Sequence, residues 1–317
     1  MNLFRKFLWN RYEHSNIQLF DIISIGYILL IGLLLIPFHN HVSNWKWLVL
    51  AHITTVIFIL ELLRFAKLHP SPMVNFLRTF YPAIGIYFAW VELGQIVNMI
   101  FPFWADNWIL HLDVTIFKTH PTVWVQQFFT PWLTELMNFF YTSYYLMIPF
   151  IGFILYFSKS RQAAFNYFSY LMLVSIICYV LFIIFPCKGA WMLLQQLHTK
   201  QLTGGFFLKL IQHLQANNAN IGCAFPSAHV ATAFTMGYVA LKYIRPLGYL
   251  VMLNAIGVAM SAVYLRYHHA VDAIGGILVA TICYFVSTYL IENWENIKTK
   301  YFKYVKQKKE PLKIVSV

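Results

Sequence analysis

The chain has 317 residues, of which 60% are hydrophobic and only 11% are charged. A soluble globular domain carries about 25% charged residues, so this composition excludes a soluble domain, and the apolar content excludes a disordered chain. A transmembrane helix needs about 20 apolar residues, and the chain holds enough of them for about eight. We therefore predict an all-α polytopic membrane bundle with about eight transmembrane helices.

Apolar runs bounded by charges, proline or glycine mark the predicted spans. In chain order they cover residues 17–37, 45–65, 79–101, 133–157, 164–185, 226–243, 246–265 and 270–291. The stretch 106–131 mixes tryptophans with polar residues and is typical of a segment at the membrane interface. A polar loop is predicted over 186–225, and a basic tail follows the last span.

The positive charges orient this bundle. Eight spans place both termini on one side, and 17 of the 23 Lys and Arg residues then fall on that side. Positive residues concentrate in cytoplasmic loops, so both termini are predicted to be cytoplasmic. The lysines from Lys298 to Lys313 directly follow the last span, so anionic lipid headgroups are a simpler partner for them than nucleic acid.

Ionisable residues gather at the non-cytoplasmic ends of the sixth and eighth spans. Pro226 and Ser227 precede His229, which falls in the first turn of a helix, where free N–H groups bind anions. His268 and Asp272 are four residues apart and share a helix face. A carboxylate on one imidazole nitrogen leaves the other free as a base or nucleophile. Such a set is typical of phosphoryl transfer.

Other polar residues are open to more than one interpretation. Arg266 and Lys188 lie in neighbouring outer loops and could hold a phosphate, although Arg266 could instead anchor lipid headgroups. His269 is expected to pack or to face solvent. Glu92, Gln95 and Asn98 recur at three-residue intervals, which favours hydrogen bonding between helices over contact with a substrate.

The motifs resemble those of the type-2 phosphatidic acid phosphatase superfamily. Residues 226–229 match its Pro-Ser-x-His block. Residues 264–272, Tyr-Leu-Arg-Tyr-His-His-Ala-Val-Asp, are more similar to the third block of the inositol phosphorylceramide synthase branch, the inositolphosphotransferases. The stretch from Leu112-Asp113 to Tyr145 also resembles that branch, so the resemblance covers roughly residues 105–290.

The resemblance implies a role for each residue of the cluster. His268 would be the nucleophile that forms a phosphohistidine, Asp272 would orient it, and His229 would protonate the leaving lipid alcohol. Ser227 and backbone amides would hold phosphate oxygens. Arg266 would stand in for the Arg that the family usually places six residues before the nucleophile.

One family block is missing. The sequence lacks the first block, Lys-x6-Arg-Pro, and Lys188 is its best positional substitute.

The resemblance also implies an architecture and a chemistry. We expect three N-terminal spans in 1–104, a phosphatase-like catalytic core in 105–292 and a basic cytoplasmic tail in 293–317. The enzyme would act on lipid phosphoesters at the periplasmic, lumenal or extracellular face, without metal or cofactor. It would pass the phosphoryl group either to water or to a lipid alcohol. A transporter or scramblase is the alternative class, but its inverted repeats and broken helices are not found.

The four cysteines divide into two pairs. Cys178 and Cys283 lie within spans and are expected to be apolar fillers. Cys187 and Cys223 lie in the same outer loop. If that side is oxidising, they could form a disulfide that ties the Lys188 segment to the Pro-Ser-x-His segment; otherwise they are free thiols.

Overall fold

The computed structural model describes residues 17–216 and 220–307. Within them the protein consists of helices joined by short loops, with one isolated β-bridge. Residues 1–16 of the predicted N-terminal part and 308–317 of the predicted tail lie outside the described residues. The prediction of an all-α fold is confirmed.

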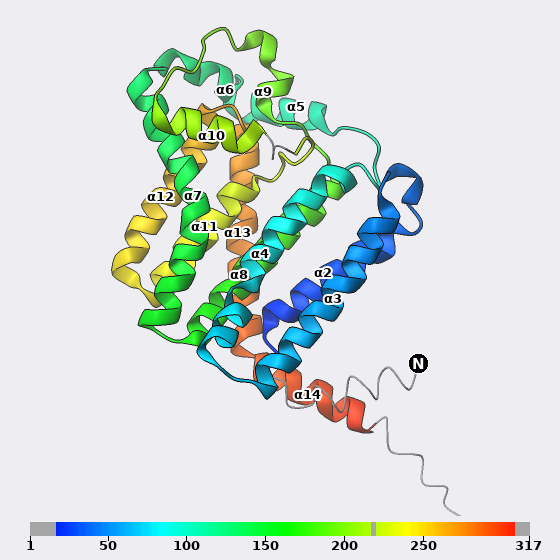
Figure 1. The fold of residues 1–317 in the computed structure, drawn as a ribbon. Helices are drawn as coiled ribbons and strands as arrows, with labels where there is room; N and C mark the ends of the chain where they lie inside the picture. Colours follow the sequence, from blue (N-terminus) through cyan, green and yellow to red (C-terminus); the bar gives the residue numbers. More distant parts are fainter. Residues whose placement is uncertain (1–16, 217–219, 308–317) are drawn as a thin grey trace, which may run out of the picture.

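A helix occupies each predicted span, and Figure 1 shows these helices packed side by side as one bundle. They are α2 (Leu19–Leu35), α3 (Trp45–Leu68), α4 (Pro72–Ile96), α7 (Pro131–Ser158), α8 (Arg161–Ile184), α11 (Ala228–Tyr243), α12 (Arg245–Tyr264) and α13 (Ala270–Glu292). Five are long and apolar enough to cross a membrane, namely α3, α7, α8, α12 and α13. The count of eight spans stays a prediction.

Several of these helices begin where local chemistry fixes their N-terminus. The hydroxyls of Ser71, Thr130 and Ser160 accept hydrogen bonds from the N–H groups of the first turns of α4, α7 and α8. Such caps satisfy donors that have no partner within the helix. In α4 and α7 a proline follows directly, at a position where its missing N–H costs nothing.

Helix α8 is the centre of the bundle. In its most apolar 18-residue window, 72% of the residues are buried, far more than in the other four long apolar helices. Helices α2, α4, α7, α11 and α13 all pack against it, and Tyr167, Phe168 and Tyr170 are fully buried between them. The helices that carry the predicted catalytic residues are therefore held by a common core.

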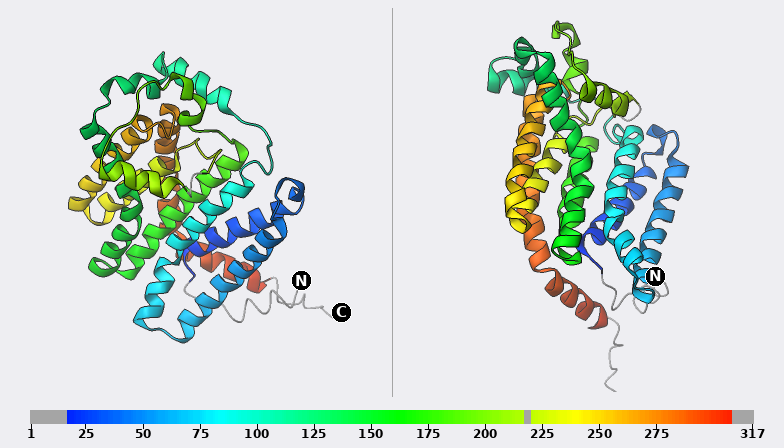
Figure 2. Two further views of the ribbon diagram at one scale, coloured as in Figure 1. Left: turned by 45° about the horizontal axis from the view of Figure 1, so that its top comes forward. Right: turned by 60° about the vertical axis from the view of Figure 1, so that its left-hand side comes forward.

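The two ends of the bundle differ. The Trp294 Nε1 group donates to the Ile17 carbonyl oxygen at 3.0 Å, so α2 begins and α13 ends at one end, where α14 (Trp294–Gln307) follows. Short helices cover the opposite end (Figure 2). They are α5 (Asp106–Phe117), α6 (Pro121–Trp124), η2 (Val125–Phe128), α9 (Ala190–Leu193), η3 (Gln195–Leu197) and α10 (Phe206–Ala216), and we call them the cap. The short η1 (His39–His41) joins α2 to α3.

The cap explains two stretches of the sequence. The predicted interfacial segment 106–131 forms α5, α6 and η2, which lie across the bundle end instead of along it. The loop predicted over 186–225 contains α10, which was not predicted. Helix α10 is amphipathic. Its apolar residues form only a short periodic pattern between residues that favour loops, so the sequence did not indicate a helix there.

A buried charge pair joins α2 to α4 near the terminal end. The third span was predicted to begin at Thr79, but α4 begins at Pro72, so Arg78 lies inside the helix and is 4% exposed. Its guanidinium contacts the fully buried carboxylate of Asp21. That carboxylate also accepts from the Tyr81 hydroxyl at 2.5 Å.

Two of the three polar residues at three-residue intervals lie in α4 and bond as predicted. Glu92 pairs with His52 of α3 at 2.8 Å, and Gln95 accepts from Asn44 at 3.4 Å, so both connect α4 to the neighbouring segment. Asn98 instead donates to the carbonyls of Phe101 and Phe103.

Replacing Arg78 with Ala is expected to lower the free energy of unfolding by about 3–5 kcal/mol, because it leaves a buried carboxylate without its partner. Chemical denaturation in detergent would measure the change. Arg64→Ala is the matched control, since Arg64 pairs with Glu61 at an exposed site, where such pairs contribute about 1 kcal/mol or less. Equal losses in the two variants would contradict the structural role of the buried pair.

Candidate active site

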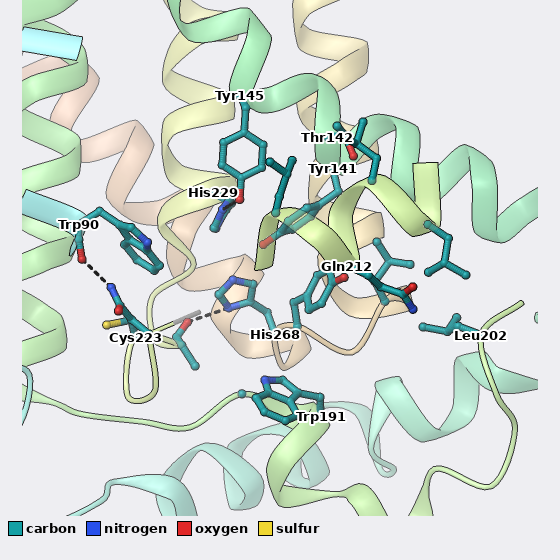
Figure 3. Close-up of a pocket in the computed structure, with 18 of the residues that line it drawn as sticks. Trp90, Tyr141, Thr142, Tyr145, Trp191, Leu202, Gln212, Cys223, His229 and His268 are labelled. Atoms are coloured by element: carbon teal, nitrogen blue, oxygen red, sulfur yellow. Dashed lines mark hydrogen bonds between the residues drawn. The ribbon is translucent and has the colours of Figure 1, made fainter. Parts of the chain in front are cut away.

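A cavity of about 820 Å³ opens at the cap end of the bundle. Its wall comes from α4, α7, α10, α11 and the loops around them, and it is mainly apolar and aromatic. His229 and His268 both point into it, as Figure 3 shows. The cavity therefore places two of the three predicted catalytic residues on one surface.

The first cause of this placement is a close contact between α11 and α13. The Ser227 N–H donates to the Asp272 carbonyl oxygen at 2.9 Å. A Cβ atom on Gly276 would lie only 2.6 Å from the Ser227 carbonyl oxygen. A glycine is needed at this position, because any side chain would push the two helices apart.

The second cause is the turn between α12 and α13. Arg266 adopts the left-handed conformation, with φ of 68°, which is uncommon for a residue with a side chain. The chain thereby folds back over the end of α12, and the His268 N–H donates to the Ala262 carbonyl oxygen at 3.0 Å. His268 is fixed by its own backbone directly before α13.

The ring of His268 is held by a carbonyl oxygen. Its Nδ1 atom lies 2.9 Å from the Ala224 oxygen, which can only accept, so Nδ1 carries the hydrogen. Nε2 then keeps its lone pair and is the atom free to react in the cavity. The Asp272 carboxylate lies farther from Nδ1, at 3.5 Å, and accepts from the His269 N–H at 2.7 Å.

His229 faces His268 from the first turn of α11, and the two ring centroids are 6.1 Å apart. Its ring stacks on Tyr141 at 4.8 Å, and its Nε2 lies 3.1 Å from the Tyr145 hydroxyl. A nucleophile and an acid each act on atoms about 3 Å away, so two rings this close can reach the same bound group.

The residues predicted to bind phosphate lie elsewhere. Ser227 is fully buried, and its hydroxyl caps α11 by accepting from the Val230 N–H at 3.4 Å. The Arg266 guanidinium donates to Gln126 at 3.2 Å and to the Lys200 carbonyl oxygen at 2.5 Å. Neither side chain lines the cavity.

Lys188 is also occupied. Its ammonium lies 3.5 Å from the Asp106 carboxylate and 4.4 Å from the centre of the Trp104 ring. Among the described residues that line the cavity, none is Lys or Arg. The phosphate-binding roles of Ser227, Arg266 and Lys188 stay predictions, and the structure does not bring these side chains together.

Two carboxylates near the cavity were not among the site residues predicted from the sequence. Asp113 of α5 is fully buried and accepts from the Val271 N–H of α13 at 3.0 Å. Glu135 of α7 accepts from the N–H groups of Phe207 and Leu208 at 2.9 and 3.0 Å, and so holds the start of α10 over the cavity. Only the Leu112-Asp113 match pointed to the first, and no local signal pointed to the second.

Cys187 and Cys223 lie side by side at the floor of the site. The Cys187 N–H donates to the Gly222 oxygen and the Ala224 N–H to the Cys187 oxygen, both at 3.0 Å. Both thiols are free and buried, and burial raises the pKa of each thiol. Backbone hydrogen bonds therefore tie the two segments, and the disulfide stays a prediction.

The number of free thiols can be counted directly. Denaturation without reductant, followed by a maleimide mass tag, is expected to label four cysteines, because all four are free thiols in the structure. In the folded protein the tag is expected to react slowly with Cys187 and Cys223, since buried protonated thiols are poor nucleophiles. Only two labels after denaturation would instead establish the disulfide.

Within the described residues, no group of three or more His, Cys, Asp or Glu side chains is arranged to hold a metal ion. Metal-free chemistry stays a prediction.

Comparison with known proteins gives few matches. A PA-phosphatase related-family protein of Dictyostelium discoideum is 37% identical over 60 residues, which are 19% of this chain and 11% of that protein. The chain thus matches only a small part of that relative. No solved structure matches the chain. The family model described as PAP2 superfamily matches residues 107–286, which include the cap, both histidines and Asp272. The chain therefore belongs to the PAP2 superfamily.

Proposed function

We propose that this protein is an integral membrane enzyme that cleaves lipid phosphoesters through a phosphohistidine on His268. The observation that carries the proposal is the pair of imidazoles that face each other across the cavity, with the hydrogen of His268 placed on Nδ1 by the Ala224 oxygen. Membership of the PAP2 superfamily supports a phosphatase-type activity on lipids.

The proposed reaction has two steps. The Nε2 lone pair of His268 attacks phosphorus, an N–P bond forms, and the P–O bond to the lipid breaks. Protonated His229 gives its proton to the leaving alkoxide. In the second step neutral His229 takes a proton from water, whose oxygen bonds to phosphorus while the N–P bond breaks. The Tyr145 hydroxyl, 3.1 Å from His229, keeps that ring in place.

A second cavity supports a lipid substrate. It has a volume of about 380 Å³ and lies between α4 and α7 over α8 and α11. It shares Tyr87, Trp90, Tyr145 and His229 with the first cavity, and its remaining wall is almost wholly apolar. A phosphate at His268 would thus leave an apolar path between helices for a hydrocarbon chain, which suits a substrate drawn from the bilayer.

The membrane face is part of the proposal. The cap lies at the end of the bundle opposite to the start of α2 and to α14 (Figure 1), and the cavity with the two histidines opens at the cap end. With the termini in the cytoplasm, as the distribution of positive charge favours, the cavity opens on the periplasmic, lumenal or extracellular face.

One observation favours a transferase as the second candidate. The cavity wall described here contains no Lys or Arg, and Arg266 and Lys188 are engaged with other partners. A phosphate monoester carries up to two negative charges, whereas a diester carries one and is easier to desolvate. A phosphodiester substrate would transfer its phospho-headgroup to a lipid alcohol, as in the synthase branch that the third block resembles.

Replacing His268 with Ala is expected to abolish turnover of a labelled lipid phosphate while the protein stays folded, because no other group can form the covalent bond. Brief incubation of the unaltered protein with that substrate should give an acid-labile phosphoprotein that His268→Ala lacks. His69→Ala, an exposed histidine in the turn between α3 and α4, is the control and should keep full activity. Retained turnover in His268→Ala would refute the mechanism.

The acceptor can be identified with purified protein and a lipid labelled in its phosphate. A phosphate monoester and a phosphodiester are assayed separately. When water is the only acceptor we expect the label in a water-soluble product, which is free phosphate from the monoester and the phosphorylated headgroup from the diester, because the phosphohistidine is then hydrolysed. Ceramide or diacylglycerol is added in parallel reactions. Label in the added lipid would support the transferase, and label in water-soluble products alone in every reaction would reject it.

A further inference from the structure

Three ionisable side chains lie directly behind the nucleophile, at the start of α13. Asp113, His269 and Asp272 are each fully buried, with no exposed surface. Two of them follow His268 in the sequence, whereas Asp113 belongs to α5 in the cap and is more than 150 residues away. Burying such groups costs free energy unless they are paired and hydrogen-bonded.

The two carboxylates hold the backbone on either side of one peptide turn. Asp272 accepts from the His269 N–H at 2.7 Å, and Asp113 accepts from the Val271 N–H at 3.0 Å. The two N–H groups belong to the first turn of a helix and have no partner within it. The helix dipole favours negative charge at this end. The residue just before this turn is His268, so the clamped backbone carries the nucleophile.

The third member of the cluster, His269, faces the Asp113 carboxylate. Its Nδ1 atom lies 3.5 Å from the Asp113 carboxylate. Burial alone would lower the pKa of His269, but the neighbouring carboxylates of Asp113, Asp272 and Asp106 raise it overall. A protonated His269 between two carboxylates leaves the buried cluster with a smaller net charge than two carboxylates alone.

Helix α5 reaches a second part of the site with its other end. The Asp106 carboxylate accepts from the Lys188 N–H at 2.8 Å, one residue beyond Cys187. Cys187 in turn binds the Ala224 N–H through its carbonyl oxygen. The same helix therefore holds the Cys187–Lys188 segment, which in turn binds the segment that carries Ala224, and it also holds the turn that follows His268.

We propose that Asp113 is a positioning residue for the nucleophile: with Asp272 it clamps the first turn of α13 and thereby holds the His268 ring against the Ala224 oxygen. This inference rests on the proposed function. It assigns to the cap helix α5 a part in catalysis, although α5 contributes no residue to the cavity wall. Loss of the clamp would let His268 move while substrate binding in the cavity is unaffected.

The expected result is a selective loss of turnover number. Asp113→Ala should lower kcat by roughly 10- to 100-fold, since a small misplacement of a reacting group has effects of this size, and should leave KM within about twofold. Asp113→Asn keeps an oxygen that can accept from Val271 and should recover most of the loss. Thr115→Ala, on the exposed side of α5, is the control and should match the unaltered protein.

A second variant removes the same hydrogen bond from the other side. Val271→Pro deletes the donated N–H at a first-turn position of α13, where proline is tolerated. It should lower kcat at least as much as Asp113→Ala does, because it also replaces a buried Val side chain. The double variant should lose no more than Val271→Pro alone, because both changes remove the same hydrogen bond. If Asp113→Ala does not fold, Val271→Pro alone carries the test through its kcat and KM.

The outcomes separate the two proposals. His268→Ala is measured in the same assay, and turnover by that variant would refute the proposed function. If His268→Ala is inactive but Asp113→Ala and Val271→Pro keep the kcat of the unaltered protein, only the clamp is refuted. Additive losses in the double variant, or an Asp113→Asn variant as slow as Asp113→Ala, would also refute it.

Discussion

The hydrogen bond between His268 and the Ala224 oxygen is the interaction on which the proposed chemistry depends. It selects the tautomer whose free nitrogen lies in the cavity, and it does so with a backbone oxygen that cannot change its protonation state. The position of that oxygen is set in turn by the hydrogen bonds of Cys187 and by the close approach of α11 and α13 at Gly276. The reactive atom is therefore placed by backbone contacts among three segments that are distant in the sequence.

The bundle provides the rigidity that such a site needs. Helix α8 is buried against α11, which carries His229, against α13, which begins two residues after His268, and against α4, which lines both cavities. The Asp21–Arg78 pair joins α2 and α4 at the far end. Charged side chains are thus buried at the two ends of the bundle, and the path proposed for a hydrocarbon chain lies between them.

The sequence revealed those features that depend on neighbours in the chain. Apolar runs predicted the helices, and the spacing of His268 and Asp272 predicted a shared site with His229, because period and motif are local. Partners across the fold were not predictable. Ser227 was expected to bind phosphate, yet its hydroxyl caps α11, and Arg266 turns away because its left-handed backbone directs it toward Gln126 and Lys200. Asp113 meets the Val271 N–H only because α5 folds across the start of α13.

The scarcity of cations in the cavity has a consequence for how a phosphate would be held. With Arg266 and Lys188 engaged by the cap, the helix N-terminus that carries His229 is the feature of the cavity that favours an anion. In the proposed mechanism the His229 imidazole is neutral once it has protonated the leaving alcohol, so the site would be less positive after the phosphohistidine has formed. A substrate with one negative charge would then lose less stabilisation than one with two, which is the physical reason for proposing a phosphodiester as the second candidate substrate.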